Sequence, residues 1–462
     1  MTTAEQQATV DSSTLPIPVT RVLAESGRRV RYDDLPADVV TRAKQCVLDW
    51  LGVTLTGSGE PLARILRDEA REQGGHEQAT LIGSGGRVAT QQAALVNGAA
   101  SHALDYDDVH AKMSGHPTVP VLPALLALAE WQGRSGRDLI AAFIAGFETE
   151  CRLGTVVMPG HYGIGWHSTA TLGTFGAAAG CAHLLGLDLE RWQHALGIAG
   201  TQAAGMKSMF GTMCKPLHAG KAAANGLFAA TLARRGFTSN PEVVETAQGF
   251  AATHTPTYSP ERIGDESADA YAIRDVLFKY HAACYGTHAT IDGLLRLKEQ
   301  HGVQSGDVES VTLHVPVSAL SMCNIQEPAT ALEGKFSLRF TAALALGHGD
   351  ATEQAFTDER VREPTLVALR DRVQVYGDEG VPGFVTEVVL QLADGRELRE
   401  SANVNTPESD LDRQWQRLEA KFRSLAGPVV GEGQAERLLA LVRDLDRVDD
   451  VREITSLTTP SA

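Results

Sequence analysis

The sequence predicts a mainly α-helical protein, with a large all-helical domain and a smaller α+β domain. Apolar residues recur at helical spacing through the first half of the chain, whereas alternating β-branched runs occur only after residue 300. The chain has 462 residues, of which 43% are hydrophobic, so it can bury a large core. At about 150 residues per domain, this length favours two or three domains.

The helices of the first half begin near Pro36, a residue type that suits a first helical turn, and Asp34 can cap the turn. From there, apolar residues recur at helical spacing as far as Leu51. Two further Ala-rich helices are predicted, over residues 122–132 and 139–147.

The stretch 169–187 is also predicted to be helical, although three glycines interrupt it. Glycine inside a helix costs about 1 kcal/mol relative to alanine, so we expect these glycines to permit close packing against another helix. A clear helix over 218–235 ends at Gly236. The run 239–242 has the composition of another helix start. The three glycines are Gly173, Gly176 and Gly180.

Strands are predicted in the last third of the chain. Residues 308–317 alternate and are β-branched, and Pro316 limits this strand to a sheet edge or to its own end. Residues 373–376 and 384–392 also have strand character, and Asp394-Gly395 predicts a tight turn after the latter.

Helical segments over 287–299 and 337–346 lie between these strands, so the region forms one α+β unit. Helical spacing returns over 411–425 and 436–448, which can pack back on the first domain. We therefore predict a discontinuous all-helical domain over 16–274 and 405–455, and an α+β domain over 275–404.

Composition excludes several classes of partner. The net charge of −16 argues against binding to nucleic acid or to an anionic membrane surface. No run of about 18 apolar residues predicts a membrane span. The six cysteines are scattered without a CxxC pair, which favours a reduced, cytoplasmic protein over a disulfide scaffold.

The most informative stretch is His102–His116, which contains three aspartates and three histidines directly after a small, apolar run. Burying such groups is costly, and their proton affinities can be tuned towards neutral pH, so the pattern predicts an acid–base or anchoring cluster. The alternative is a solvated acidic turn that caps the next helix. A metal site is a rival explanation, but no HExxH or similar ligand spacing occurs, and we predict no metal.

Cationic and imidazole side chains recur at predicted loop-to-helix junctions. His167 precedes one helix and Lys215 precedes Pro216 at another, where free N–H groups favour an anionic ligand. Taken singly, these residues could be a polar loop histidine and a surface lysine. Cys284 could be a nucleophile or, more commonly, a buried structural cysteine. Together with Lys279, the pattern predicts a cleft for a small polycarboxylate.

At these residues the chain resembles the 2-methylcitrate dehydratase superfamily, MmgE/PrpD, from about Val22 to Leu425. The resemblance implies a large helical domain, a smaller lid domain, a homodimer and no iron–sulfur cluster. Members include 2-methylcitrate dehydratase, cis-aconitate decarboxylase and iminodisuccinate epimerase. The motifs that carry it include Asp49-Trp-Leu-Gly52, His102-Ala-Leu-Asp105-Tyr-Asp-Asp108, His116-Pro117, Gly165-Trp-His167, Lys215-Pro-Leu-His218 and Lys335-Phe-Ser337.

The resemblance also implies an active site between the domains. Two positions depart from the family pattern: Cys284 stands near a histidine of the decarboxylases, and Val109 replaces a threonine frequent in dehydratases and decarboxylases. These departures argue against a plain assignment to either activity. The functional positions of the family fall on Asp105, His116, His167, Lys215 and Lys279.

We therefore expect a lyase without a cofactor, which removes a proton next to a carboxylate of a small polycarboxylate, by dehydration or decarboxylation. His167 or Asp105 would be the base, and His116 would protonate a leaving hydroxyl or carbon. An epimerase of a dicarboxylate is the main alternative, followed by a metallohydrolase and a non-catalytic binder. The residues expected to bind the substrate are Lys215, Lys279, His288 and Cys284.

Overall fold

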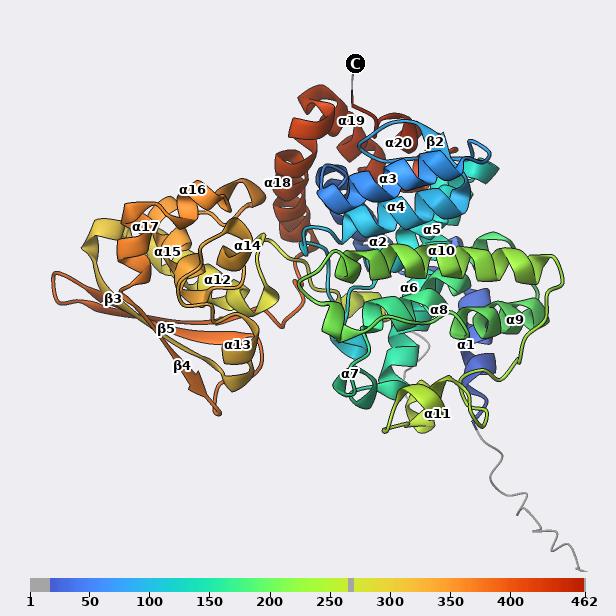
Figure 1. Ribbon diagram of the computed structural model, residues 1–462, viewed down its shortest axis with the longest axis horizontal. Helices are drawn as coiled ribbons and strands as arrows, with labels where there is room; N and C mark the ends of the chain where they lie inside the picture. Colours follow the sequence, from blue (N-terminus) through green and yellow to red (C-terminus); the bar gives the residue numbers. More distant parts are fainter. Residues whose placement is uncertain (1–16, 265–269, 461–462) are drawn as a thin grey trace, which may run out of the picture.

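The computed structural model describes residues 17–264 and 270–460 and divides into two bodies (Figure 1). One body is wholly helical apart from a two-stranded hairpin, and the other combines helices with a four-stranded sheet. The prediction of a mainly α-helical protein with a smaller α+β domain is confirmed.

The larger body contains the N-terminal helices and the short hairpin strands β1 (Ala79–Thr80) and β2 (Arg87–Val88). Helix α8 lies at its centre, packed against α5, α6, α9 and α10. The helices are α1 (Val19–Arg29), α2 (Ala37–Gly57), α3 (Pro61–Gln73), α4 (Thr90–Ser101), α5 (Thr118–Gln132), α6 (Gly136–Val157), α7 (Gly160–Gly163), α8 (Ser168–Leu184), α9 (Leu189–Gly200), α10 (Cys214–Arg234) and α11 (Phe250–His254).

The glycines of α8 permit the close helix packing that their sequence predicts. A Cβ atom on Gly173 would lie 2.5 Å from the Cβ of Pro120 on α5, and one on Gly180 would lie 2.9 Å from a backbone oxygen of α6. At Gly176 the nearest atom would be a carboxylate oxygen of Glu150, at 2.8 Å. Small residues at these contacts let the central helix approach both neighbours closely.

Replacing Gly173 with alanine is expected to destabilise the protein by about 1–3 kcal/mol, because the rigid ring of Pro120 cannot move aside. The control is Gly433→Ala in the first turn of α19 (Glu432–Arg443), where nothing lies within 4 Å of the added Cβ. There, the better helix propensity of alanine should stabilise the protein by up to about 1 kcal/mol. Urea unfolding of both variants checks the prediction, and equal midpoints would contradict it.

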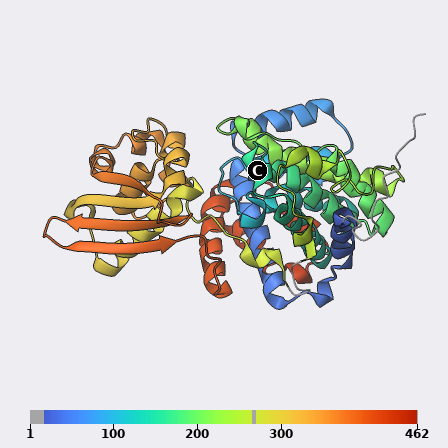
Figure 2. The same cartoon turned by 90° about the horizontal axis from the view of Figure 1, so that it is seen from below.

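The smaller body is a sheet covered by helices, with strand order β4-β3-β5-β6. Strand β3 pairs in parallel with β4 and antiparallel with β5, which continues through the predicted turn into β6 (Figure 2). Pro316 is the last residue of β3, where its missing N–H interrupts nothing. The strands are β3 (Val308–Pro316), β4 (Val373–Asp378), β5 (Val385–Leu392) and β6 (Glu397–Asn403).

The longest helices of this body are α12 and α15, which contact each other, and α12 also packs on β5 and β6. Helix α15 contacts α17 and the edge strand β4. The helices are α12 (Tyr285–His301), α13 (Val317–Met322), α14 (Ala331–Gly334), α15 (Leu338–His348), α16 (Asp358–Val361) and α17 (Pro364–Arg370).

The chain then returns to the larger body through α18 (Leu411–Val430), which packs along α2 and stands between the two bodies (Figure 1). Helices α19 (Glu432–Arg443) and α20 (Arg452–Ser456) follow. The boundaries 274/275 and 404/405 stay predictions, and residue 16 lies outside the described residues. Among the described helices, none is both long and apolar enough to span a bilayer.

One predicted helix start is wrong. The run 239–242 lies in turns, and the next helix, α11, begins only at Phe250. The hydroxyl of Ser239 donates to the backbone oxygen of His194 at 3.0 Å, and its N–H donates to that imidazole at 3.1 Å. Ser239 therefore ties the chain to α9, and its hydroxyl caps no helix.

Candidate active site

The acidic stretch between α4 and α5 folds as a tight, largely buried turn. Asp105 adopts a left-handed backbone conformation with φ of 51°, which aspartate tolerates better than most residues. Its N–H donates to the backbone oxygen of His102 at 3.3 Å. A non-glycine residue in this conformation is typical of functional sites, because the surrounding structure must hold it there.

Two lysines converge on one oxygen of Asp105. Lys215, in the first turn of α10, places Nζ 2.7 Å from Oδ1, and Lys279 places Nζ 3.0 Å from the same atom. Lys279 is almost fully buried, with 2% of its side chain exposed. Burial alone would raise the pKa of Asp105, but the two ammonium groups hold that pKa well below its usual range. The carboxylate therefore stays ionised and fixes both lysines.

Asp107 connects two histidines. Its carboxylate lies 2.9 Å from Nδ1 of His102 and 2.9 Å from Nδ1 of His116. Burial favours protonation of Asp107, yet the two imidazoles hold its pKa well below the usual value. With Nδ1 facing Asp107, His116 turns Nε2 towards Asp105, 3.7 Å from Oδ1. A carboxylate behind an imidazole orients it and stabilises its protonated form.

His167 stands at the N-terminus of α8, beside this cluster. Its ring stacks with His102 at 5.8 Å between centroids, and its Nδ1 lies 3.0 Å from Nδ1 of His218. The edge of Phe210 lies 5.0 Å away. Burial, reinforced by the neighbouring cations, lowers the pKa of His167 well below 6.5. At neutral pH this imidazole is uncharged and can accept a proton.

Asp108 has a structural role at the start of α5. It accepts hydrogen bonds from the hydroxyl of Thr118 at 2.5 Å and from its N–H at 3.4 Å. Burial raises the pKa of Asp108 to about 8. Asp108 therefore caps α5, as the alternative interpretation of the acidic turn predicts, but it is buried and not solvated. The other two aspartates, Asp105 and Asp107, contact lysines and histidines.

Lys421 of α18 binds three segments next to the cluster. Its buried ammonium pairs with Asp49 at 2.5 Å and donates to the backbone oxygens of Tyr106 at 2.7 Å and Lys279 at 2.8 Å. One side chain thus joins α2, the acidic turn and the segment that carries Lys279. Sequence reasoning missed Lys421, because nothing in its local sequence distinguishes it from a surface lysine.

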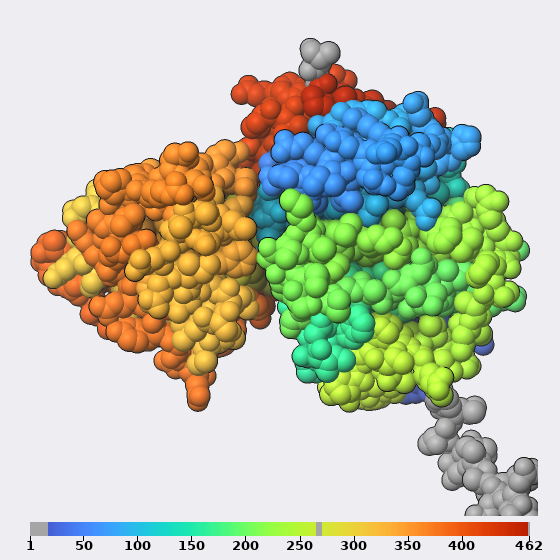
Figure 3. Space-filling model, in the orientation of Figure 1, coloured from blue at the N-terminus to red at the C-terminus, as the bar shows by residue number. Residues whose placement is uncertain are grey.

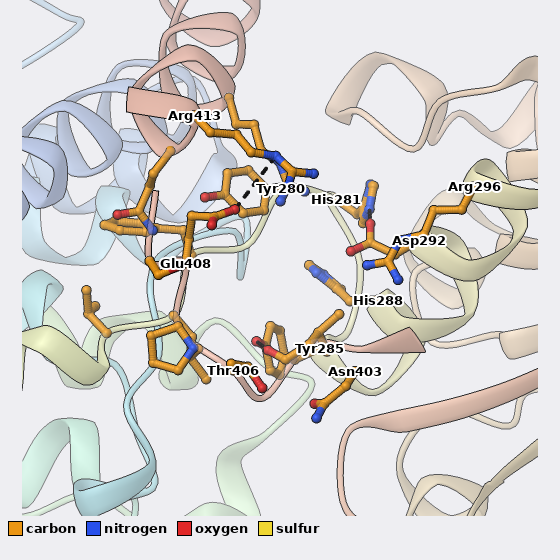
Figure 4. Close-up of a pocket in the computed structure, with 18 residues that line it drawn as sticks. Tyr280, His281, Tyr285, His288, Asp292, Arg296, Asn403, Thr406, Glu408 and Arg413 are labelled. Atoms are coloured by element: carbon orange, nitrogen blue, oxygen red, sulfur yellow. Dashed lines mark hydrogen bonds and ion pairs between the residues drawn. The ribbon is translucent and has the colours of Figure 1, made fainter. Parts of the chain in front are cut away.

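The structure brings together Asp105, His116, His167, Lys215 and Lys279. Cys284 is buried, its N–H donates to the backbone oxygen of Lys335 at 2.9 Å, and its thiol is hydrogen-bonded to Cys323. The charges of Asp105 and Lys279 act on this thiol, so Cys284 lies near the cluster. His288 lines a separate cavity between the bodies, with Nε2 3.1 Å from the backbone oxygen of Ala283 (Figure 4). Substrate binding by Cys284 and His288 stays a prediction.

Some residues of the cluster could also hold a metal ion. His102, Asp105, Asp107 and His116 each offer a ligand atom, and these atoms lie within 4.8 Å of one another. Sequence spacing missed this set because the turn, not a helix, brings the groups together. The ammonium groups of Lys215 and Lys279 already occupy Asp105, however, and would repel a cation.

The smaller body meets the larger one along a narrow seam (Figure 3). The cluster itself offers two fixed ammonium groups, a neutral imidazole and an imidazole backed by a carboxylate. Fixed positive charge of this kind stabilises negative charge that develops on a substrate, and the imidazoles can move protons.

Several known proteins are similar to this chain over most of its length. The chain is 29% identical to a cis-aconitate decarboxylase-like protein of Aspergillus oryzae, over 97% of this chain and 99% of that protein. It is 28% identical to human cis-aconitate decarboxylase, over 95% and 94% of the two chains. A mitochondrial 2-methylcitrate dehydratase of Yarrowia lipolytica is 24% identical, over 73% and 70%.

The MmgE/PrpD N-terminal domain matches residues 21–263, and the MmgE/PrpD C-terminal domain matches residues 281–447. The two matches together cover most of the chain. This chain therefore belongs to the MmgE/PrpD family.

Proposed function

We propose that the protein is a lyase that acts on a small polycarboxylate through a carbanion next to a carboxylate. The observation that carries this proposal is the convergence of Lys215 and Lys279 on Asp105, beside His116 and His167. The names of the relatives, decarboxylases and a dehydratase of tricarboxylates, support the same class of reaction.

In this mechanism the substrate carboxylate binds to the two lysines. Loss of a proton or of carbon dioxide from the neighbouring carbon leaves an electron pair, which delocalises into that carboxylate as an aci form. Its extra negative charge is stabilised by the fixed ammonium groups, which need no rearrangement during the reaction. Asp105 holds the lysines in place.

The two imidazoles have different roles. His167 is the base, because burial keeps it neutral, whereas the carboxylate of Asp105 is already held by the ammonium groups of Lys215 and Lys279. His116 is the acid, because Asp107 holds its Nδ1 and leaves Nε2 directed towards Asp105 and the lysines. In dehydration, His167 takes the carbon-bound proton and His116 protonates the departing hydroxide to water. In decarboxylation, carbon dioxide leaves and an imidazolium returns one proton to carbon.

The relatives favour these two lyase reactions and give no support to the epimerase alternative. The assay gives purified protein cis-aconitate, citrate and 2-methylcitrate in separate reactions. Release of carbon dioxide from cis-aconitate identifies a decarboxylase, and growth of alkene absorbance from citrate or 2-methylcitrate identifies a dehydratase. Absence of turnover with all three would overturn the proposal, and hydrolase activity with stoichiometric zinc or manganese would favour a metalloenzyme.

The family membership also leads us to propose a homodimer. Sedimentation equilibrium of the purified chain should give twice the chain mass of 49.3 kDa. A monomer at micromolar concentration that retains full activity would contradict this part of the proposal.

A further inference from the structure

A second polar cavity lies between the two bodies, and its lining includes no residue of the Asp105 cluster. Its volume is about 270 Å³, near the lower limit of small-molecule sites. The larger body contributes Arg413 and Arg417 of α18, and the smaller body contributes His288, Asp292 and Arg296 of α12 (Figure 4). The two segments that connect the bodies form the remaining walls.

Arg417 of this cavity forms no direct salt bridge. Its guanidinium lies 3.5 Å above the ring centroid of Tyr280, and no described residue forms an ion pair or hydrogen bond with it. Arg413 lies one turn earlier on the same face of α18 and makes only a loose pair with Glu408, at 3.8 Å. Two guanidinium groups therefore border the cavity with most of their N–H donors unused.

The acidic groups of the cavity are already paired. Asp292 accepts from Nε2 of His281 at 2.7 Å, and this contact, together with the charges of Arg417 and His288, overcomes burial and lowers the pKa of Asp292 to about 2. On the opposite wall, Arg296 pairs with Glu400 at 3.1 Å on its exposed side. Figure 4 shows Arg413 and Arg296 on facing walls. The unmatched charge in the cavity is therefore positive, although the whole chain has a net charge of −16.

We propose that this cavity is a second ligand site, which binds a small oxyanion through Arg413 and Arg417, with Arg296 contacting it from the smaller body. The planar guanidinium groups suit the two oxygens of a carboxylate or phosphate. An occupant would contact both bodies at once. It would also lie against Tyr280, the neighbour of Lys279 in the sequence. The backbone oxygen of Lys279 accepts a hydrogen bond from Lys421, which lies one turn after Arg417 on α18.

The test uses the full chain carrying Lys215→Ala, so that anion binding at the proposed active site is weakened and turnover is not required. Inorganic phosphate and succinate are titrated separately by calorimetry. We expect saturable binding of at least one of them, with one site per chain. The tighter of the two identifies the site as a phosphate or a carboxylate site.

Adding Arg417→Gln should weaken this binding at least tenfold. The matched control is Arg437→Gln on α19, an exposed arginine far from the cavity walls, which should leave the affinity unchanged. Arg296→Gln, on the smaller body, should also weaken binding of the anion. This variant replaces Arg417→Gln in the test if the latter does not fold. Absence of saturable binding of both anions, or equal affinity after Arg417→Gln in a folded chain, would overturn the inference.

Discussion

Lys215→Ala is expected to lower kcat/KM by about 10²–10³-fold, because it removes one of the two cations that stabilise the developing aci carboxylate. The melting temperature should change by only a few degrees. Asp105 keeps its second partner, Lys279, so the substitution leaves no buried charge unpaired. Steady-state kinetics and thermal unfolding of the same preparation measure both effects.

The matched control is Lys221→Ala, which removes an exposed lysine from the same helix, away from Asp105. Its rate and melting temperature should equal those of the parent. A drop of many degrees for Lys215→Ala would indicate that the lysine supports the fold, and a parental rate would exclude it from the reaction.

His167→Gln is expected to lower kcat by about 10²–10⁴-fold, the usual contribution of a general base. The pH dependence follows from the sign of the shift. Burial lowers the pKa of His167 well below 6.5, so the free base persists as the pH falls through 6.5 and disappears only in more acidic solution. The acid limb of the wild-type kcat/KM profile should therefore lie below pH 6.5 and be absent in the variant.

His183→Gln provides the comparison for this prediction. His183 lies in the last turn of the same helix and contacts the backbone oxygen of Val30, far from the cluster. Its rate and pH profile should match those of the parent. An acid limb at or above pH 6.5, or one that persists in His167→Gln, would assign the base to another group.

Much of the fold follows from sequence because its signals are local. The α2 helix has apolar periodicity, and α10 is rich in alanine and followed by Gly236. The glycines of α8 indicate a close contact whose partner, Pro120, only the structure identifies. The helix start predicted at Ser239 is wrong because the hydrogen bonds of Ser239 to His194 outweigh its tendency to cap a helix. Strand β6 was missed, since its residues are mostly polar and its partner β5 supplies its hydrogen bonds.

The candidate site, like the fold, combines features that local sequence predicts with features that depend on tertiary contacts. The motifs around Asp105, His116, His167, Lys215 and Lys279 each contain an unusual residue at a helix boundary, which sequence can detect. The second carboxylate contact, in which Asp107 joins two imidazoles, depends on the left-handed turn at Asp105 and not on spacing. His288 lies about one helical turn after Cys284, and it lines the other cavity.

The central claim is that this cluster moves a proton to or from carbon beside a carboxylate, and deuterium incorporation tests it most directly. The protein reacts with cis-aconitate, citrate and 2-methylcitrate in deuterium oxide, and mass spectrometry follows substrate and product. We predict one solvent deuterium on carbon with at least one of them, and strong loss of incorporation in Lys215→Ala and His167→Gln. No incorporation from any of the three, or undiminished incorporation in both variants, would contradict the account.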